Sequence, residues 1–136
     1  MQLVDIGANL THASFGDDLP EVLARAAAAG VDFMVVTGSS VRESERAIAL
    51  AAAHANLYAT AGVHPHHARE CDERTIPALR ALARHPRVVA LGECGLDFNR
   101  NYSPHPDQEK WFVAQLELAT EAKKPVLVNF ELPATA

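Results

Sequence analysis

Short apolar runs rich in β-branched residues alternate along the chain with longer segments of mixed polarity. The apolar runs, interpreted as strands, cover residues 3–7, 31–36, 57–63, 88–91 and 125–130. The segments between them carry apolar residues at helical spacing and predict helices at about 19–29, 41–54, 75–85 and 107–123. Continuous apolar runs are typical of strands that are covered on both faces. The pattern therefore predicts an α/β fold with right-handed crossovers and a parallel sheet.

Local signals define some of these elements in more detail. Ser40 and Glu43 have the spacing of a capping box, which predicts the start of the second helix. The inner face of that helix is expected to contain Val41, Ile48, Ala51 and Ala52. The fourth strand is expected to end at Gly92, so that Glu93 is the first polar side chain beyond it. Cys94, on the opposite face, is expected to be a small core residue.

The composition is that of a single globular domain. The chain has 136 residues, of which 49% are hydrophobic, enough to form a core. Twelve basic against 17 acidic residues give a net charge of −5, without the basic excess of a dedicated nucleic-acid binder. Cys71 and Cys94 match neither a zinc knuckle nor a disulfide framework, which suggests a reducing compartment. The sequence shows neither a signal peptide nor a membrane span, so we expect a cytoplasmic protein.

Polar residues lie at the carboxyl ends of the first four predicted strands. They are Asp5 with Asn9, Thr37 with Ser39, His64 with His66, and Glu93 with Asp97. In α/β folds the carboxyl ends of parallel strands converge on one rim, where the chemistry collects. Carboxylate oxygens and imidazole nitrogens on such a rim suit a hydrolytic Zn²⁺, Mg²⁺ or Mn²⁺ site, because the ion lowers the pKa of bound water. Glu93 is the leading site residue in this interpretation.

Structural roles compete with these functional ones. Glu93 could pair with a neighbouring arginine or cap the next turn. His64 and His66 could belong to a solvated turn with no chemical role. Asp97 and Arg100 could simply form an ion pair that stabilises their loop. The residue pattern alone leaves these alternatives open.

Three segments together resemble the TatD family of metal-dependent deoxyribonucleases. They are DIGANLT, TAGVHPH and GECGLDFNRN, and the likeness extends from about Gln2 to Val128. The resemblance implies a (β/α)₈ TIM barrel of the amidohydrolase type, roughly twice as long as this chain. It also implies a metal site at the carboxyl-terminal rim that cleaves phosphodiester bonds in DNA, often as a 3′–5′ exonuclease.

The resemblance assigns roles to individual residues. Glu93 matches the metal-bridging carboxylate, and His64 matches an element that faces metal and substrate, so these two are the predicted catalytic residues. Many family members have two histidines at the end of strand one, where this chain has Gly7 and Asn9; Asn9 is predicted as a metal ligand beside Glu93. The predicted substrate-binding residues are His66, Asp97, Asn99 and Arg100. The implied cofactor is a divalent Mg, Mn or Zn ion, and the implied substrate is DNA.

The likeness ends near the carboxyl terminus. Where the family has a metal-binding histidine and an arginine on strand five, this chain has Asn129 and Glu131. Residues 129–136 diverge, so we expect one partial TIM-barrel domain over residues 1–136, truncated after about strand five. We hypothesise that the chain is the first part of a longer enzyme, ended by a frameshift, a premature stop or an altered gene model.

Such a partial barrel has predictable properties. Its first and fifth strands would be exposed edges, through which the chain could associate with itself. With few ligands left, it would bind metal weakly and have little or no nuclease activity. The alternatives are a hydrolase of another ester or amide on the same rim, and a residual fold or interaction module without catalysis.

Overall fold

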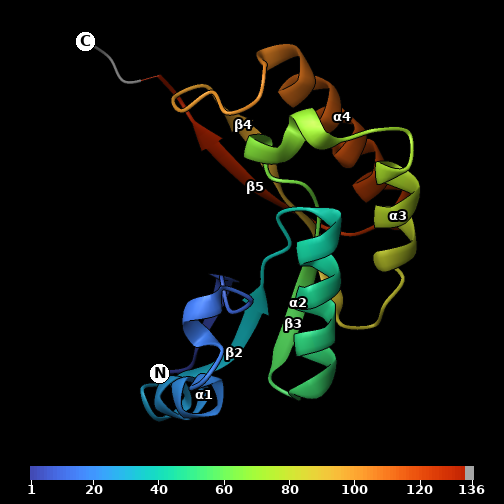
Figure 1. Cartoon of the computed structure of the whole chain (residues 1–136). Coiled ribbons are helices and arrows are strands. Elements are labelled where there is room, and N and C mark those ends of the chain that lie inside the picture. Colours follow the sequence, from blue (N-terminus) through green and yellow to red (C-terminus); the bar gives the residue numbers. More distant parts are fainter. Residues whose placement is uncertain (134–136) are drawn as a thin grey trace.

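Five parallel strands, paired in sequence order, form an open sheet in the computed structural model, which describes residues 1–133 (Figure 1). The strands are β1 (Leu3–Ala8), β2 (Val31–Val36), β3 (Leu57–Ala61), β4 (Val88–Asp97) and β5 (Val126–Glu131). The helices are α1 (Leu19–Ala28), α2 (Val41–Ala53), α3 (Thr75–Leu82) and α4 (His105–Ala122), with 3₁₀ turns η1 (Ala13–Phe15) and η2 (Pro65–Glu70). Strand and helix alternate as predicted, and the sheet is a partial barrel.

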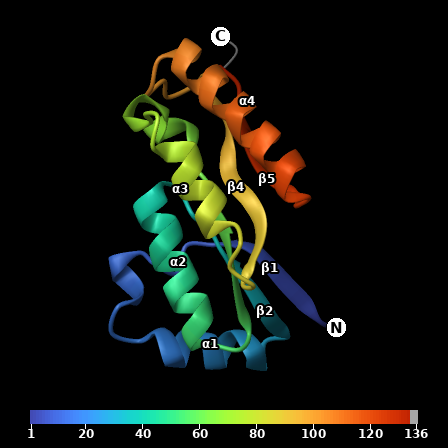
Figure 2. The ribbon, with the colours of Figure 1, turned by 90° about the vertical axis from the view of Figure 1, so that its right-hand side faces the viewer.

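The core lies between the sheet and the helices α2, α3 and α4, which stand side by side in Figure 2. Its fully buried members include Val36, Leu57, Leu79 and Leu91. The predicted cap of α2 is present, because the Ser40 side chain accepts a hydrogen bond from the Glu43 backbone N–H. This packing covers one face of the three central strands.

One prediction for α2 is wrong. Ala52 is exposed, whereas Ser44, Ala47, Ile48 and Ala51 are buried against the sheet. These four positions follow the spacing of a single helical stripe, and Ala52 lies about 100° beyond its last member. A polar residue, Ser44, therefore occupies a place on the buried face that an apolar pattern does not reveal.

The prediction that the fourth strand ends at Gly92 is also wrong, because β4 continues to Asp97. Gly92 and Gly95 have φ values of +127° and +145°, which residues with a side chain rarely adopt. A Cβ atom on Gly95 would lie only 1.9 Å from the backbone oxygen of Asn129. These glycines let β4 and β5 approach closely across a register shift and keep pairing as far as Asp97 and Glu131.

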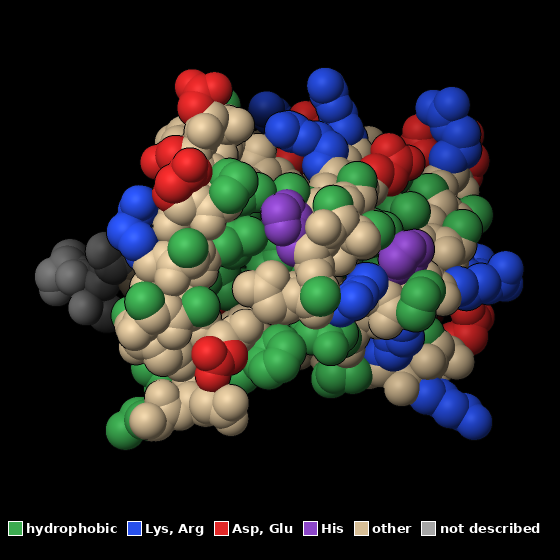
Figure 3. Space-filling model, turned by 90° about the horizontal axis from the view of Figure 1, so that it is seen from below, with side chains coloured by type: hydrophobic (Ala, Val, Ile, Leu, Met, Phe, Trp, Pro, Cys, Tyr) green, Lys and Arg blue, Asp and Glu red, His purple; other side chains and the backbone are tan. Residues whose placement is uncertain are grey.

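The two outer strands are poorly covered. Within residues 1–133, β1 pairs only with β2, and β5 only with β4. Their exposed apolar side chains include Leu3, Val4, Ile6, Val128 and Phe130. Hydrophobic side chains also reach the surface in patches between charged groups on the face seen in Figure 3. No helix among residues 1–133 is long and apolar enough to cross a membrane.

Candidate active site at the carboxyl ends of the strands

Backbone hydrogen bonds tie the exits of three neighbouring strands together. The N–H of His64, after β3, donates to the carbonyl oxygen of Ser39 at 2.9 Å. The N–H of Glu93, in β4, donates to the carbonyl oxygen of Gly38 at 2.8 Å. Both acceptors lie just beyond β2, so the backbone positions of His64 and Glu93 are fixed relative to the same short segment.

Two buried polar side chains on helices hold the chain where it leaves β3. Ser44 of α2 accepts a hydrogen bond from the N–H of Gly62 at 3.1 Å and donates to its carbonyl oxygen at 3.3 Å. Gln115 of α4 accepts from the N–H of Val63 at 2.8 Å and donates to its carbonyl oxygen at 3.2 Å. These peptide groups are therefore satisfied by side chains in place of a strand partner, and they precede His64 directly.

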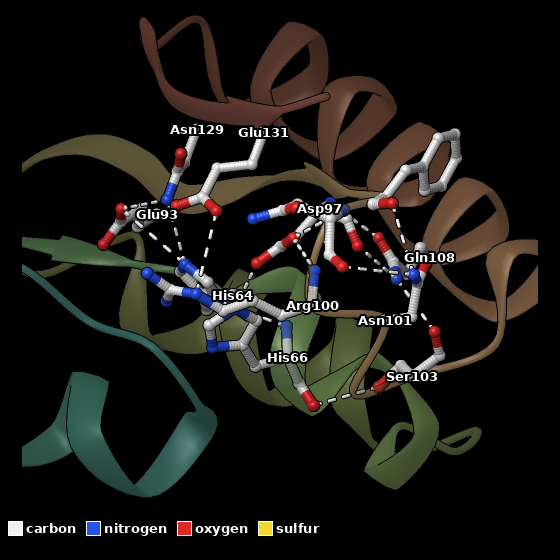
Figure 4. Close-up of polar contacts among 12 residues, drawn as sticks. His64, His66, Glu93, Asp97, Arg100, Asn101, Ser103, Gln108, Asn129 and Glu131 are labelled. Carbon is white, nitrogen blue, oxygen red and sulfur yellow. Dashed lines mark hydrogen bonds and ion pairs between the residues drawn. The ribbon is translucent and has the colours of Figure 1, made fainter. Parts of the chain in front are cut away.

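The structure brings His64, Glu93 and Asn129 into one cluster on the rim (Figure 4). Nε2 of His64 lies 3.9 Å from Oε1 of Glu93. The amide nitrogen of Asn129 lies 3.0 Å from the same His64 nitrogen and donates to Oε1 of Glu93 at 3.1 Å. His64 and Glu93 are thus neighbours although 29 positions separate them in the sequence. The contact made by Asn129 was not foreseen.

The ring of His64 is neutral near pH 7. Burial, together with the nearby His66 and His67, lowers the pKa of His64 from 6.5 to about 4. Both ring nitrogens face hydrogen-bond donors, because the backbone N–H of His66 donates to Nδ1 at 3.1 Å and the amide nitrogen of Asn129 lies 3.0 Å from Nε2. Glu93 is too far away for a full hydrogen bond. His64 is therefore a neutral imidazole whose Nε2 faces the rim (Figure 4).

His66 points to a different carboxylate, that of Asp97. Its Nε2 lies 2.5 Å from Oδ2 of the buried Asp97 side chain. Burial acts to raise the pKa of Asp97, but hydrogen bonds from the backbone N–H groups of Arg100 and Asn99 and from His66 outweigh it and lower the pKa. Asp97 is therefore an ionised acceptor that orients His66.

The alternative of an Asp97–Arg100 ion pair does not describe the loop. Asp97 accepts from the backbone N–H of Arg100 at 2.9 Å, whereas the nearest carboxylate to the guanidinium is Glu131, at 3.8 Å. Arg100 and Asn99 are both exposed at the rim. The positive charge of Arg100 thus remains accessible to a ligand.

A second glutamine of α4 holds the end of β4. Gln108 accepts a hydrogen bond from the N–H of Asp97 at 2.7 Å and donates to its carbonyl oxygen at 3.1 Å. Gln108 and Gln115 are seven residues apart, so they lie on the same face of the helix. Sequence reasoning missed both, although two glutamines seven residues apart on a predicted helix were a usable signal.

The described residues do not form a complete metal-binding set. Among residues 1–133, no group of three or more His, Cys, Asp or Glu side chains is arranged to hold an ion. Nε2 of His64 lies 3.0 Å from the amide nitrogen of Asn129, and His66 is paired with Asp97. Asn9 is exposed beyond the end of β1, and no hydrogen bond in this part of the chain links it to Glu93. Glu93 offers a partly exposed carboxylate in the cluster, and Glu131 at the end of β5 offers another, 3.8 Å from the guanidinium of Arg100 (Figure 4).

Cys94 lies beside Glu93 but belongs to the core, as expected. It is fully buried, and burial raises the pKa of its thiol to about 12. The thiol is therefore protonated at neutral pH and does not act as a nucleophile.

A family model described as "TatD related DNase" matches residues 4–129. This chain belongs to the TatD family. A relative from Cronobacter turicensis, named "3′-5′ ssDNA/RNA exonuclease TatD", is 50% identical over 127 residues. A relative of the same name from Salmonella typhimurium is 46% identical over 127 residues. Each match covers 93% of this chain but 48% and 49% of the relative, so the chain spans about half the length of these TatD proteins.

Solved structures of the TatD family have the same fold. A TatD homologue from Escherichia coli superposes with a TM-score of 0.85 at 30% identity, over 93% of this chain and 49% of that one. A TatD family hydrolase from Entamoeba histolytica gives a TM-score of 0.86 at 28% identity, over 96% of this chain and 50% of that one. The five strands therefore correspond to part of a TatD-like barrel, as the sequence predicted.

Proposed function

We propose that this chain carries the first part of a nuclease site that hydrolyses phosphodiester bonds of DNA, acting from the 3′ end of a single strand. The observation that carries the proposal is the rim cluster in which the neutral imidazole of His64 lies beside the carboxylate of Glu93. The names of the relatives support the choice of reaction and substrate. This chain alone is expected to be weakly active or inactive, because its ligand set is incomplete.

The chain's own residues suit phosphate recognition. In the tautomer with its proton on Nε2, the neutral ring of His64 can donate to a phosphoryl oxygen without taking up a further proton. The exposed guanidinium of Arg100 supplies positive charge at the same rim. His66 and Asn99 offer further polar groups, with His66 oriented by Asp97. We assign these four residues to substrate binding or positioning.

We propose that Glu93 binds a divalent cation, Mg²⁺, Mn²⁺ or Zn²⁺, and does so weakly in this chain. Oxygen ligands suit these ions, but one carboxylate gives little affinity on its own. The prediction that Asn9 is a second ligand stays a prediction. No step of the reaction is assigned to the ion, because the described residues do not complete its site.

Metal titration and DNA cleavage test the proposal together. Isothermal titration with Mn²⁺ should show weak binding that disappears in Glu93→Gln, and slow shortening of 5′-labelled single-stranded DNA from its 3′ end should disappear with it. Cys94→Ser, next in sequence but buried, is the matched control and should change neither readout. Metal binding that survives Glu93→Gln would contradict the assignment and favour a non-catalytic interaction module.

The exposed edges support a second proposal, that the chain associates with a copy of itself. β1 and β5 present unpaired backbone groups and exposed apolar side chains. Light scattering at increasing concentration should show a mass above that of the 14.6 kDa chain. A single monomeric species at tens of micromolar would contradict this association.

A further inference from the structure

The loop that follows β4 is held rigidly on one side of Tyr102. Asn101 adopts a left-handed conformation with φ of 55°, and its side-chain amide donates to the carbonyl oxygens of Phe98 and Asn99 at 3.2 and 3.3 Å. The ring of Phe98 stacks on His105 with 3.8 Å between centroids. These contacts fix the backbone immediately before Tyr102.

The residue after Tyr102 is fixed as well. Ser103 is buried, and its hydroxyl donates to the carbonyl oxygen of His66 at 2.9 Å and accepts from the N–H of Arg69 at 3.0 Å. Its own carbonyl oxygen accepts from Gln108 at 2.8 Å. Tyr102 therefore occupies a backbone position with little freedom, although its side chain is 56% exposed.

The exposed ring of Tyr102 is connected to the rim cluster by ring–ring contacts. It meets His66 edge to face, with 4.7 Å between ring centroids, and His66 meets His64 in the same way at 4.1 Å. His66 is in turn held by Asp97. The tyrosine ring is thus connected through the ring of His66 to the ring of His64 at the rim.

A large aromatic ring that is exposed, rigidly placed and close to phosphate-binding groups suits a nucleobase. Bases of single-stranded nucleic acid stack on such rings, and the stacking tolerates any sequence because every base has a flat face. A ring whose backbone is already fixed loses little conformational entropy on binding. Bases inside a duplex are stacked on each other and are not available to it.

We propose that Tyr102 is a stacking platform for a base of single-stranded nucleic acid. A phosphate of the same strand contacts the rim cluster at His64. The inference rests on the proposed function and deepens it, because it assigns a binding site to one base of the single-stranded substrate. The competing interpretation is structural: the ring only covers His66. Variants at position 102 that retain or remove the flat face separate the two.

Binding of a 5′-fluorescein-labelled oligodeoxythymidine, followed by fluorescence anisotropy in EDTA so that cleavage plays no part, tests the platform. Tyr102→Ala and Tyr102→Leu should each weaken binding about 5- to 100-fold, whereas Tyr102→Trp should bind as the native chain does. The leucine retains apolar cover over His66 but has no flat face. Phe33→Ala, at an exposed aromatic residue of β2, is the control and should leave binding unchanged.

An oligonucleotide of the same length with abasic sites completes the design. The native chain and Tyr102→Ala should bind it equally, since no base remains to stack. A leucine variant that binds like the native chain, an equal loss on the abasic strand, or no binding by the native chain would each overturn the platform. Tyrosine-dependent binding without any cleavage in Mg²⁺ or Mn²⁺ would refute the proposed hydrolysis and leave the platform intact.

Discussion

The centre of the sheet and its two outer strands differ in how their backbone polar groups and apolar side chains are covered. At the exits of β3 and β4, peptide groups that have left the sheet are bound by buried side chains of the covering helices, such as Ser44 and Gln115. Along β1 and β5, apolar side chains such as Ile6 and Phe130 stay exposed, 62% and 58%, and one backbone edge of each strand has no neighbouring strand.

This difference shows which part of the fold fixes the positions of the site residues. The rim cluster depends on side chains fixed relative to each other, and helices α2 and α4 provide that by reaching past the strand ends. The outer strands contribute sheet pairing but little burial. We therefore expect changes at the centre to cost stability and site geometry together, and changes at the edges to affect mainly association.

The largest expected effect comes from removing a core side chain at the centre. Leu57→Ala in β3 should lower the free energy of unfolding by about 2–5 kcal/mol, because Leu57 is fully buried and a cavity would remain. Urea unfolding followed by circular dichroism measures this loss. Val4→Ala in β1, where the side chain is 55% exposed, is the matched control, and an equal loss there would contradict the comparison.

The second-largest expected effect is a loss of folding stability at low pH. The pKa of His64 is lowered from 6.5 to about 4, so the unfolded chain takes up this proton at a higher pH than the folded one. Stability should therefore fall between pH 6.5 and 4, by roughly 3 kcal/mol from this group. The pKa of Asp97 is also lowered, so its contribution is lost in the same direction as pH falls through the folded value.

Unfolding free energies across this pH range measure the loss. The matched variant is His64→Gln, which removes the titrating ring and should flatten the dependence between pH 6.5 and 4. His54 is the C-cap residue of α2, at the opposite end of the helix from Ser40. His54→Gln is the control for replacing a histidine and should leave the slope unchanged. A native slope in His64→Gln would show that other groups cause the acid sensitivity.

Removing the hydrogen bonds of Gln115 to the backbone of Val63 should have a somewhat smaller effect on stability. In Gln115→Met the side chain keeps its approximate size, but the N–H and carbonyl of Val63 lose their partners. A buried unsatisfied peptide group costs about 1–3 kcal/mol, so a loss of about 2 kcal/mol is expected. Glu117→Met, at an exposed position on the same helix, should change the unfolding free energy by less than about 0.5 kcal/mol.

The alternation of strands and helices could be predicted because it depends on local periodicity. The bounds of β2 and the Ser40 cap of α2 followed from adjacent residues, and both agree with the structure. The end of β4 was misplaced because Gly92 was taken as a stop signal, whereas Gly92 and Gly95 allow close approach of β5. That meaning of a glycine depends on a neighbour more than 30 residues away.

The candidate site, like the fold, could be predicted only in part. His64 and Glu93 could be brought together because parallel strands deliver their ends to one rim. Asn129 and Gln115 could not, since their contacts depend on which face of a distant element meets the rim. Polar residues on faces predicted to be buried deserve the same scrutiny as polar residues at strand ends.

The smallest expected effect on stability lies at the edge. Ile6→Lys places a charge on an outer strand where the native side chain is 62% exposed, so the unfolding free energy should change by less than about 0.5 kcal/mol. The same charge should oppose pairing of β1 with another strand, because edge lysines block association between sheets. Light scattering should then show a lower mass than for the native chain at equal concentration.

A control separates the edge from the general effect of added charge. Glu117→Lys changes charge at an exposed position of α4 and should leave the mass unchanged. If Ile6→Lys unfolds the chain, β1 is more tightly packed than its exposure indicates. If it alters neither stability nor mass, β1 is not where copies of the chain meet, and the exposed apolar side chains of β5 become the surface to test.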